Sequence, residues 1–275
     1  MTISEYYCIL ISSKKQIVKA MIKSVQKAIT ILKILSDTPY DGVALKQISK
    51  ASGIERSTCH HILETLCFEG YAQKISSNGE YMLGPEAYLL TRFGKYNENL
   101  ISLCHPVLLY LAKKTSKTAM LAVLANNQKL IIDRIDIKNE IYRHNAQIFA
   151  DDIYRTATGR ILLSHMPQEN IYEIYIKYGL PKTDEWDGIK SFTELLSALK
   201  AIKKQKFIHT ASYTKDGSRY LGLGKAIMKE GKCVGAIGLA SVTKPNENAC
   251  SLSQSELNIF LYAAAEINRR LKLDA

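Results

Sequence analysis

The sequence lacks the features that define several large classes of protein. Its longest apolar runs, such as YYCILI over residues 6–11, are far shorter than the roughly 20 residues that a transmembrane helix requires. Glu5 precedes that run and two lysines follow it, so we expect no signal peptide. The chain contains no nucleophile elbow, no HExxH and no Walker A loop, and its histidines are scattered singly. We therefore expect neither a membrane protein nor an enzyme.

The six cysteines lack a pattern as well. No two of them form a CxxC pair, which disfavours a disulfide framework and fits a reducing cytoplasm. Cys59 and Cys67 fall at helical core positions, so we expect them to be small core residues. Cys59, His60 and His61 are adjacent, and successive helical residues point in different directions. We predict no metal site there and no cofactor elsewhere.

The size and charge of the chain set further limits. With 275 residues and 47% hydrophobic content, the protein is large enough for two domains with ordinary cores. The net charge is +11, but residues 22–84 hold seven Lys/Arg and six Asp/Glu, while residues 85–275 carry a net +8. Basicity therefore gives only weak support for a nucleic-acid partner. Any such role must be argued from the pattern of side chains.

That pattern is clearest between Val43 and Tyr71, which predicts two amphipathic helices joined by a turn at Gly53. The second helix begins near Glu55 and sets short polar and basic side chains opposite its apolar stripe. Such side chains suit base edges and phosphate oxygens, although a helical hairpin can also be a plain packing unit. We predict that bases are approached by Ser57, Thr58, His60 and His61, and phosphates by Lys46, Arg56 and Lys74.

Two further elements flank this helix pair. The segment YAQKISSNGEYMLG places two short strands around Asn78-Gly79, a strong signal for a tight hairpin turn. Upstream, KSVQKAITILKIL predicts another helix, with one apolar face. The residues of that face are Val25, Ile29, Leu32 and Leu35. Three helices followed by a hairpin are typical of a winged helix-turn-helix domain.

These segments resemble the DNA-binding domain of the IclR family of bacterial transcriptional regulators. The similarity runs from IKSVQKAITILKIL at residue 22 through LKQISKASGIERSTCHHILETLCFEGYA and includes the Ser57-Thr58 pair. Two later segments, RTATGRILLSHMP and GKCVGAIGLAS, resemble that family's effector-binding domain. The resemblance covers about residues 22 to 273. It implies a GAF/PAS-like second domain that binds a small metabolite, often an organic acid.

The remainder of the chain alternates predicted helices and strands. Pro85 begins a helix that is interrupted near Gly94, strand pairs turn at Asn126-Asn127 and at Glu230-Gly231, and a last helix starts at Ser253. Further helices are predicted over 155–166, 168–178 and 191–205. We therefore expect an α+β protein whose second domain carries a mostly antiparallel sheet. The predicted parts are an N-terminal extension (1–21), a winged helix-turn-helix domain (22–84, with the helix-turn-helix at 44–63), a linker helix (85–98) and an effector-binding domain (99–275). For residues 1–21 we favour a true start at Met21.

The second domain is predicted to be a binding module, since a helix packed on a curved sheet leaves a concave face floored by small residues. The effector-binding residues implied by the resemblance are Arg143, Ala157, Thr158, Ser212, Tyr220, Gly238 and Ala240. This chain departs from the family where it reads TASYTK and where Gly238 and Ala240 replace serines, so the usual effector is not assumed. Arg143 is a candidate for binding a carboxylate or phosphate. We expect Arg155 and Arg160 to be surface cations.

Together these features predict a cytoplasmic regulator that binds an operator in double-stranded DNA under the control of a small, acidic effector. Two half-sites require a homodimer or tetramer. Two alternatives stay open: a winged-helix module for protein contact, and a GAF-type catalytic domain with a regulatory module.

Overall fold

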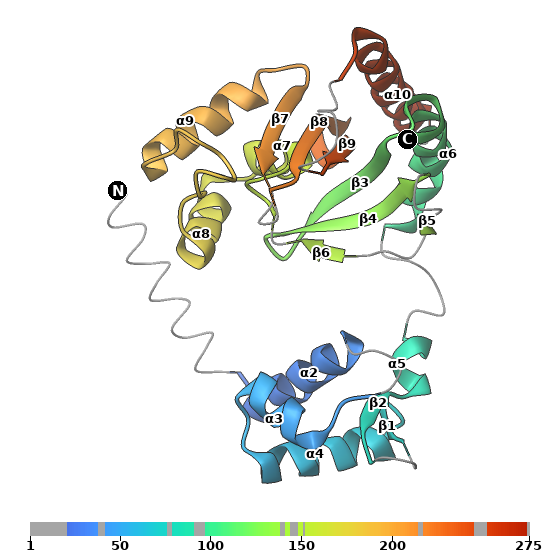
Figure 1. Cartoon of the computed structure of the whole chain (residues 1–275), viewed down its shortest axis with the longest axis vertical. Coiled ribbons are helices and arrows are strands. Elements are labelled where there is room, and N and C mark those ends of the chain that lie inside the picture. The colour runs from blue at the N-terminus through green and yellow to red at the C-terminus, as the bar shows by residue number, and fades with distance from the viewer. Residues whose placement is uncertain are drawn as a thin grey trace. The chain divides into compact units, whose positions relative to one another are not determined.

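The computed structural model describes most of the chain. The described residues are 21–37, 42–75, 79–90, 97–137, 152–213, 217–244 and 252–273, with the backbone alone of 141–143 and 148–150. Residues 1–20, Asn78 and Gly94 lie outside them, and so do the predictions made for those positions. The chain divides into two compact units, residues 1–95 and 96–275 (Figure 1). Among the described residues, no helix combines the length and the apolar character needed to cross a bilayer.

The N-terminal unit has the predicted winged helix-turn-helix fold. Its elements are α2 (Lys23–Ser36), α3 (Leu45–Ser52), α4 (Arg56–Phe68), β1 (Ala72–Lys74), β2 (Tyr81–Leu83) and α5 (Pro85–Leu89). Strands β1 and β2 pair antiparallel, and Val43 adds a bridge to Tyr81. The three helices enclose one core, in which Ile31, Ile48, Cys59 and Leu63 are fully buried. The prediction that Cys59 is a core residue is therefore confirmed.

The predicted apolar face of α2 is partly wrong. Leu35 is buried as expected, but Val25 and Ile29 are 50% and 48% exposed, while Ile31 is completely buried. The helix turns Ile31 and Leu35, four residues apart, toward α3 and α4. Val25 and Ile29 continue an apolar strip with Met21 on the outer side of the unit.

The C-terminal unit is built on one antiparallel sheet. Its strands are β3 (Thr118–Ala125), β4 (Gln128–Asp136), β5 (Ile141–Arg143), β6 (Ile148–Ala150), β7 (Ile208–Tyr213), β8 (Arg219–Lys229) and β9 (Lys232–Thr243). They follow the order β5-β4-β3-β9-β8-β7, and β6 also pairs with β4. Both predicted hairpin turns are confirmed, since Asn126, Asn127, Glu230 and Gly231 all have positive φ.

Helices cover both faces of this sheet. They are α6 (Glu98–Thr115), α7 (Ala157–Ser164), α8 (Gln168–Tyr178), α9 (Phe192–Lys203) and α10 (Gln254–Leu273). Helices α6 and α10 pack on one face over the largest core cluster, and α7 packs on the other with α9 beyond it (Figure 1). Burial on both faces explains why β3 reads as a nearly continuous apolar run, TAMLAVLA, rather than an alternating one.

Candidate nucleic-acid interface and ligand pocket

The turn before α4 is held by a dense set of local hydrogen bonds. Gly53 has a φ of 66°, the left-handed conformation that its position predicted. The Ser49 hydroxyl donates to the Ile54 carbonyl at 2.7 Å, and the Ile54 amide donates to the Ser52 hydroxyl at 3.2 Å. These bonds fix the path of the chain between α3 and α4. The crossing of the two helices is therefore set by residues of the turn itself.

Glu55 caps the N-terminus of α4. Its carboxylate accepts from the Ser57 and Thr58 amides at 3.1 and 3.3 Å and also from the Ser57 hydroxyl. The Ser57 hydroxyl is the first cause, and the amide bonds the next, of a Glu55 pKa below its ordinary value. A carboxylate at this end also complements the helix dipole. Ser57 and Thr58 thus belong to the capped first turn of α4, and they also lie on the face that is predicted to contact DNA.

The outer face of α4 is polar and exposed. Arg56, Ser57 and His61 are exposed, and Thr58 and His60 are half-buried at its border. No carboxylate of the described residues forms an ion pair with Arg56. Behind this face the apolar stripe predicted for the helix is confirmed, with Leu63 and Leu66 buried in the core. The structure therefore presents a basic guanidinium and several hydrogen-bonding groups to solvent.

Glu64 joins the two histidines of this face. The Nδ1 atoms of His60 and His61 lie 3.4 and 3.3 Å from the same Glu64 oxygen. One ligand atom from each of the three residues falls within 4.8 Å of the others. The sequence pattern placed Glu64 on this same exposed face, but the prediction that no further metal ligand lies near His60 and His61 is wrong, because the Glu64 carboxylate is close to both. The three side chains therefore form one patch on the outer face of α4.

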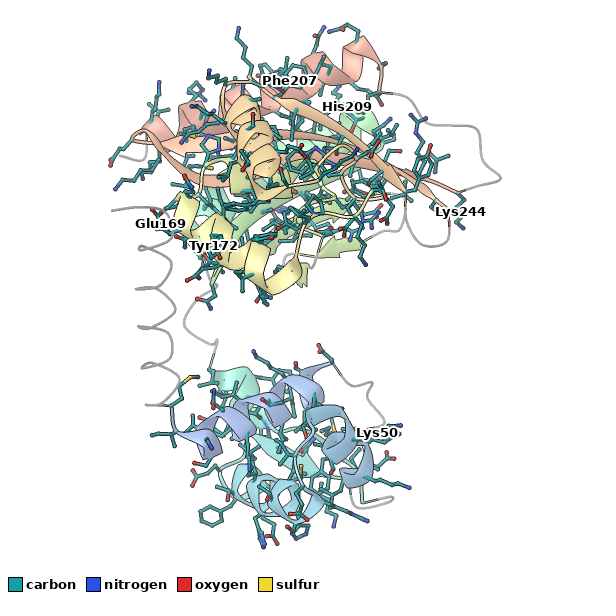
Figure 2. The ribbon with its side chains drawn as sticks, turned by 90° about the vertical axis from the view of Figure 1, so that its left-hand side faces the viewer. Lys50, Glu169, Tyr172, Phe207, His209 and Lys244 are labelled. Carbon is teal, nitrogen blue, oxygen red and sulfur yellow. The ribbon has the colours of Figure 1, made fainter. Side chains whose placement is uncertain are left out.

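Lys46 and Lys74 lie on other elements of the same unit. Lys46 is exposed on the first turn of α3, and Lys74 is exposed at the end of β1, with its ammonium 5.8 Å from the centre of the Tyr81 ring. Lys50 also reaches the surface of the unit, at the end of α3 (Figure 2). The predicted phosphate contacts therefore come from α3, α4 and the wing.

In the C-terminal unit, the N-terminus of α7 is anchored by a buried lysine. Thr156 caps the helix by accepting from the Gly159 amide at 3.3 Å, and its hydroxyl also accepts from Lys129 Nζ at 2.9 Å. Lys129 is 1% exposed and forms an ion pair with Asp152. Burial lowers the pKa of Lys129, and the charge of Asp152 opposes that shift. The sequence pattern did not indicate Lys129, because a single lysine in a strand is ordinarily exposed.

Most of the predicted effector residues meet under α7. Ala157 and Thr158 lie in its first turn, Tyr220 on β8, and Gly238 and Ala240 on β9. They enclose a small space of about 160 Å³ in which no part is wide enough for a water molecule. The space has further lining residues that the sequence did not indicate, which are Met120, Thr156, Gly222, Leu223 and Leu239. The helix and the sheet are therefore in close contact where the pocket was predicted.

Glycines permit this contact. A Cβ on Gly238 would stand 2.6 Å from Thr158 Cγ2, and one on Gly224 would stand 2.8 Å from the carbonyl carbon of Ala157. Both distances are too short for real atoms, so any larger side chain would push α7 away from the sheet.

Two hydroxyl groups in this region have no hydrogen-bond partner among the described residues. They are Thr158 Oγ1 and Ser212 Oγ, both buried. Ser212 lies opposite Tyr220 in the pairing of β7 with β8. Burial raises the pKa of Tyr220, and the charge of Asp152 adds to that effect, so its phenol keeps its proton and can donate. Buried hydroxyls usually find partners, which makes this face suited to a polar ligand.

The sheet pairs Arg143 with a second arginine. Arg143 lies on β5 opposite Arg134 of β4, and its side chain is outside the described residues. Arg134 was not singled out in the sequence, yet it lies next to Arg143. Its Nη2 forms an ion pair with Asp136 at 3.3 Å, while its Nε is buried with no partner among the described residues. Its side chain also shares the sheet face of Met120, a lining residue, because the two pair across β3 and β4.

The expectation that Arg155 and Arg160 are surface cations is wrong. Arg160 is 9% exposed, lies 4.2 Å over the Trp186 ring, and donates to the Tyr154 and Glu185 carbonyls. Arg155 forms an ion pair with Asp184 at 2.8 Å, and its side chain is 16% exposed. Asp184 and Glu185, which meet Arg155 and Arg160, lie 29 and 25 residues further along the chain, and local periodicity does not show such partners.

The fold places the chain in the class of two-domain winged-helix proteins that carry an α/β domain with a helix-covered pocket. The model of the IclR helix-turn-helix domain matches residues 24–76, and that of the bacterial transcriptional regulator IclR C-terminal domain matches residues 96–209. The chain belongs to the IclR family of bacterial transcriptional regulators.

Individual relatives are distant. The chain is 24% identical over 166 residues to the acetate operon repressor of Salmonella typhimurium, a match that covers 59% of this chain and 60% of the relative. It is 23% identical over 229 residues to the HTH-type transcriptional regulator XynR of Escherichia coli, covering 83% and 90%. Matches to the first curated relatives thus span about 60% of their length.

Solved structures share the fold. An IclR homolog from Microbacterium hydrocarbonoxydans, complexed with 4-hydroxybenzoate, superposes with a TM-score of 0.69 at 18% identity, covering 91% of this chain and 99% of that one. A regulator from Alicyclobacillus acidocaldarius gives a TM-score of 0.66 at 17% identity, with the same coverage.

Proposed function

We propose that the protein is a sequence-specific DNA-binding transcriptional regulator, active in the cytoplasm, whose operator affinity is set by a small acidic effector. The observation that carries this proposal is the outer face of α4, where Arg56, Ser57 and His61 are exposed. Hydrogen bonds in the preceding turn fix the start of this helix. A helix of this kind fits the major groove, and the β1–β2 wing supplies an adjoining contact. The relatives' names, which include an operon repressor, support repression as the output.

The proposed DNA contacts divide by chemistry. Ser57, Thr58, His60 and His61 contact base edges, since their short polar side chains donate and accept hydrogen bonds. Lys46, Arg56 and Lys74 contact phosphates and set the position of the helix on the duplex.

The exposed apolar strip of α2 supports a dimer. Met21, Val25 and Ile29 follow helical spacing and are each more than 40% exposed. A second copy of the chain covers this strip in our proposal, and it brings a second α4 to the other half-site. Replacing Val25 and Ile29 with Lys is expected to shift the sedimenting species to lower mass and to weaken operator binding. Unchanged mass would place the dimer contact elsewhere.

The proposed effector binds under α7, against Thr158, Ser212 and Tyr220. The 4-hydroxybenzoate found in the Microbacterium homolog supports a small carboxylate as ligand class. The remaining proposed contacts are Arg143, Ala157, Gly238 and Ala240, with Arg134 as a further cation. Since the space is narrow, binding must move α7 relative to the sheet. The effector changes DNA binding only if its affinities for the two arrangements differ.

DNA binding is tested by salt dependence. The full-length protein is used to select fragments of genomic DNA, and the affinity for a selected fragment is measured by fluorescence anisotropy between 50 and 200 mM salt. Binding that depends on phosphate contacts weakens steeply over this range, and Arg56→Gln is expected to reduce the slope of log K against log salt by about 1. Lys33→Gln, an equal charge change on the exposed side of α2, serves as the matched control. Affinity that ignores salt would instead support a winged-helix module for protein contact.

A further inference from the structure

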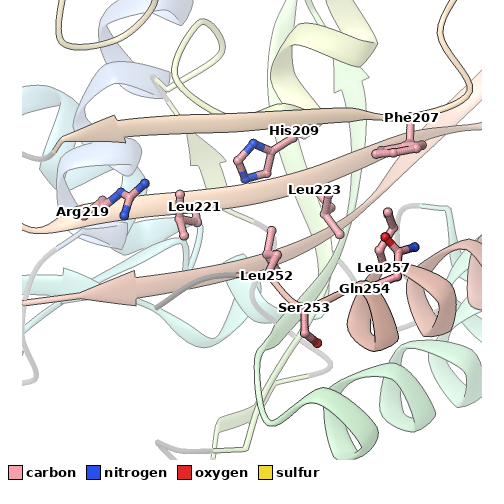
Figure 3. A pocket seen from close by; sticks show the side chains of 9 residues that line it. All are labelled: Phe207, His209, Arg219, Leu221, Leu223, Leu252, Ser253, Gln254 and Leu257. Atoms are coloured by element: carbon pink, nitrogen blue, oxygen red, sulfur yellow. The ribbon is translucent and has the colours of Figure 1, made fainter. Parts of the chain in front are cut away.

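A second pocket lies on the other face of the strands that carry the proposed effector residues. It has a volume of about 360 Å³, within the range of small-molecule sites. Figure 3 shows its lining side chains rising from two neighbouring strands and from the start of α10. The lining residues are Phe207, His209, Arg219, Leu221, Leu223, Leu252, Ser253, Gln254 and Leu257.

The alternation of side chains along a strand separates the two pockets. On β7, Thr210 and Ser212 are buried on the α7 side. His209, one residue before Thr210, faces the other way. On β8, Tyr220 faces α7, while Arg219 and Leu221 line the second pocket. The two sites therefore stand back to back across one layer of the sheet.

The ionisable side chains that line the second pocket are all basic. Arg219 and His209 line it, and no Asp or Glu is among the nine lining residues. Among the residues that the structure describes, no carboxylate forms an ion pair with Arg219. Burial, and then the charge of Arg219, lower the pKa of His209, so that Arg219 supplies the fixed positive charge. Phe207 and His209 lie at the β7 side of the C-terminal unit (Figure 2).

The rest of the lining is apolar. Leu221 and Leu223 are 2% and 3% exposed and form the floor, and Leu252 and Leu257 stand at the side next to α10. A fixed cation beside a leucine-lined floor suits a ligand with one carboxylate and an apolar body, because the carboxylate forms a charge-assisted bond and the body leaves water.

We propose that this second pocket binds a small apolar monocarboxylate, with Arg219 holding the carboxylate and Leu221 and Leu223 contacting the apolar part. The site is distinct from the one proposed under α7. Leu223 is a lining residue of both pockets, so the second pocket shares one residue of β8 with the first. The inference concerns binding alone and does not depend on DNA recognition.

The test uses phenylacetate as probe and its uncharged amide, phenylacetamide, as the matched comparison. Each is titrated calorimetrically into the full-length protein. We expect phenylacetate to bind at least tenfold more tightly than the amide, and Arg219→Gln to remove that difference. Lys225→Gln, which makes the same charge change on β8 outside the lining, is expected to keep the affinity within twofold. Circular dichroism confirms that each variant is folded.

Three outcomes would overturn the proposal. Equal affinity for phenylacetate and phenylacetamide would show that Arg219 does not bind the carboxylate. Loss of phenylacetate binding in Thr158→Val, with full binding in Arg219→Gln, would place the probe under α7 instead. A change in sedimenting mass in Arg219→Gln without any probe binding in the wild type would identify this face as a contact between copies of the chain. Failure of DNA binding would leave all three measurements unaffected.

Discussion

The ammonium group of Lys129 donates a hydrogen bond of 2.9 Å to the hydroxyl of Thr156, which at the same time caps α7. The hydroxyl also donates to the Asp152 carbonyl at 3.2 Å, so its one donor and two acceptor positions are all in use. A strand lysine and a helix cap thus share one atom. This atom fixes where α7 begins relative to the sheet.

Thr156→Val is expected to destabilise the protein by about 2–4 kcal/mol, because the cap is lost and a buried lysine loses a partner. Ser191→Ala, which removes the side-chain cap of α9 without a buried lysine behind it, is expected to cost only about 1 kcal/mol. Urea unfolding monitored by circular dichroism measures both values. Equal losses would mean that Lys129 contributes nothing through Thr156.

Gly238→Ala is expected to reduce the free energy of unfolding by about 1–3 kcal/mol, through overpacking. The added methyl group would stand 2.6 Å from Thr158 Cγ2 and 3.0 Å from Met120 Cγ, so α7 must shift. Val242→Ala, on the exposed part of the same strand, should stay within about 0.5 kcal/mol of the wild type. A loss equally small for Gly238→Ala would show that α7 is not closely packed there.

Glu64→Gln is expected to tighten binding to random duplex DNA by about twofold to fivefold at 50 mM salt. The change removes a negative charge from the face of α4 that we propose meets DNA, and the gain should shrink at 200 mM salt because exposed charges are screened. Fluorescence anisotropy measures the affinities. Glu86→Gln on α5 is the control, and an equal gain there would indicate a general charge effect.

The pH dependence of stability should show the pairing of Glu266. Its hydrogen bonds with Arg269 and then Arg270 lower its pKa from 4.5 to about 2. A carboxyl group with a lowered folded-state pKa stabilises the fold above pH 4.5 and loses that contribution as the pH falls toward 2.

Glu266→Gln should therefore melt at a lower temperature than the wild type at pH 6, and the gap should close as the pH approaches 2. Glu69→Gln, at an exposed carboxylate with no ion pair among the described residues, controls for loss of a negative charge. A gap that stays constant between pH 6 and 2.5 would contradict the role of the two arginines.

Local sequence signals predicted much of the fold. Asn126-Asn127 and Gly231 indicated turns because Asn and Gly adopt positive φ more readily than other residues, and both turns occur where expected. The apolar stripe of α4 was predicted correctly, because the helical spacing of its residues depends only on that helix.

The errors share a physical cause, which is dependence on partners distant in the chain. Ile29 and Ile31 both belong to an apolar stretch, and only the position of α3 and α4 decides which of them is buried. Arg160 is buried because Trp186 and the Glu185 carbonyl meet it from a later segment. In the candidate pocket, Ala157 and Gly238 were recovered by resemblance, but Lys129 was not, because its acceptors Asp152 and Thr156 lie more than 20 residues further on.

The unpartnered hydroxyls of Thr158 and Ser212 have a consequence for how a ligand is measured. Each buried oxygen without a partner costs the fold free energy that a suitable hydrogen bond restores. A molecule that bonds both would raise the melting temperature by more than its apolar contacts alone explain. Thermal shift across a set of isosteric acids and hydroxy acids would therefore rank them by the polar pattern they offer, and so identify the natural metabolite class without a known operator.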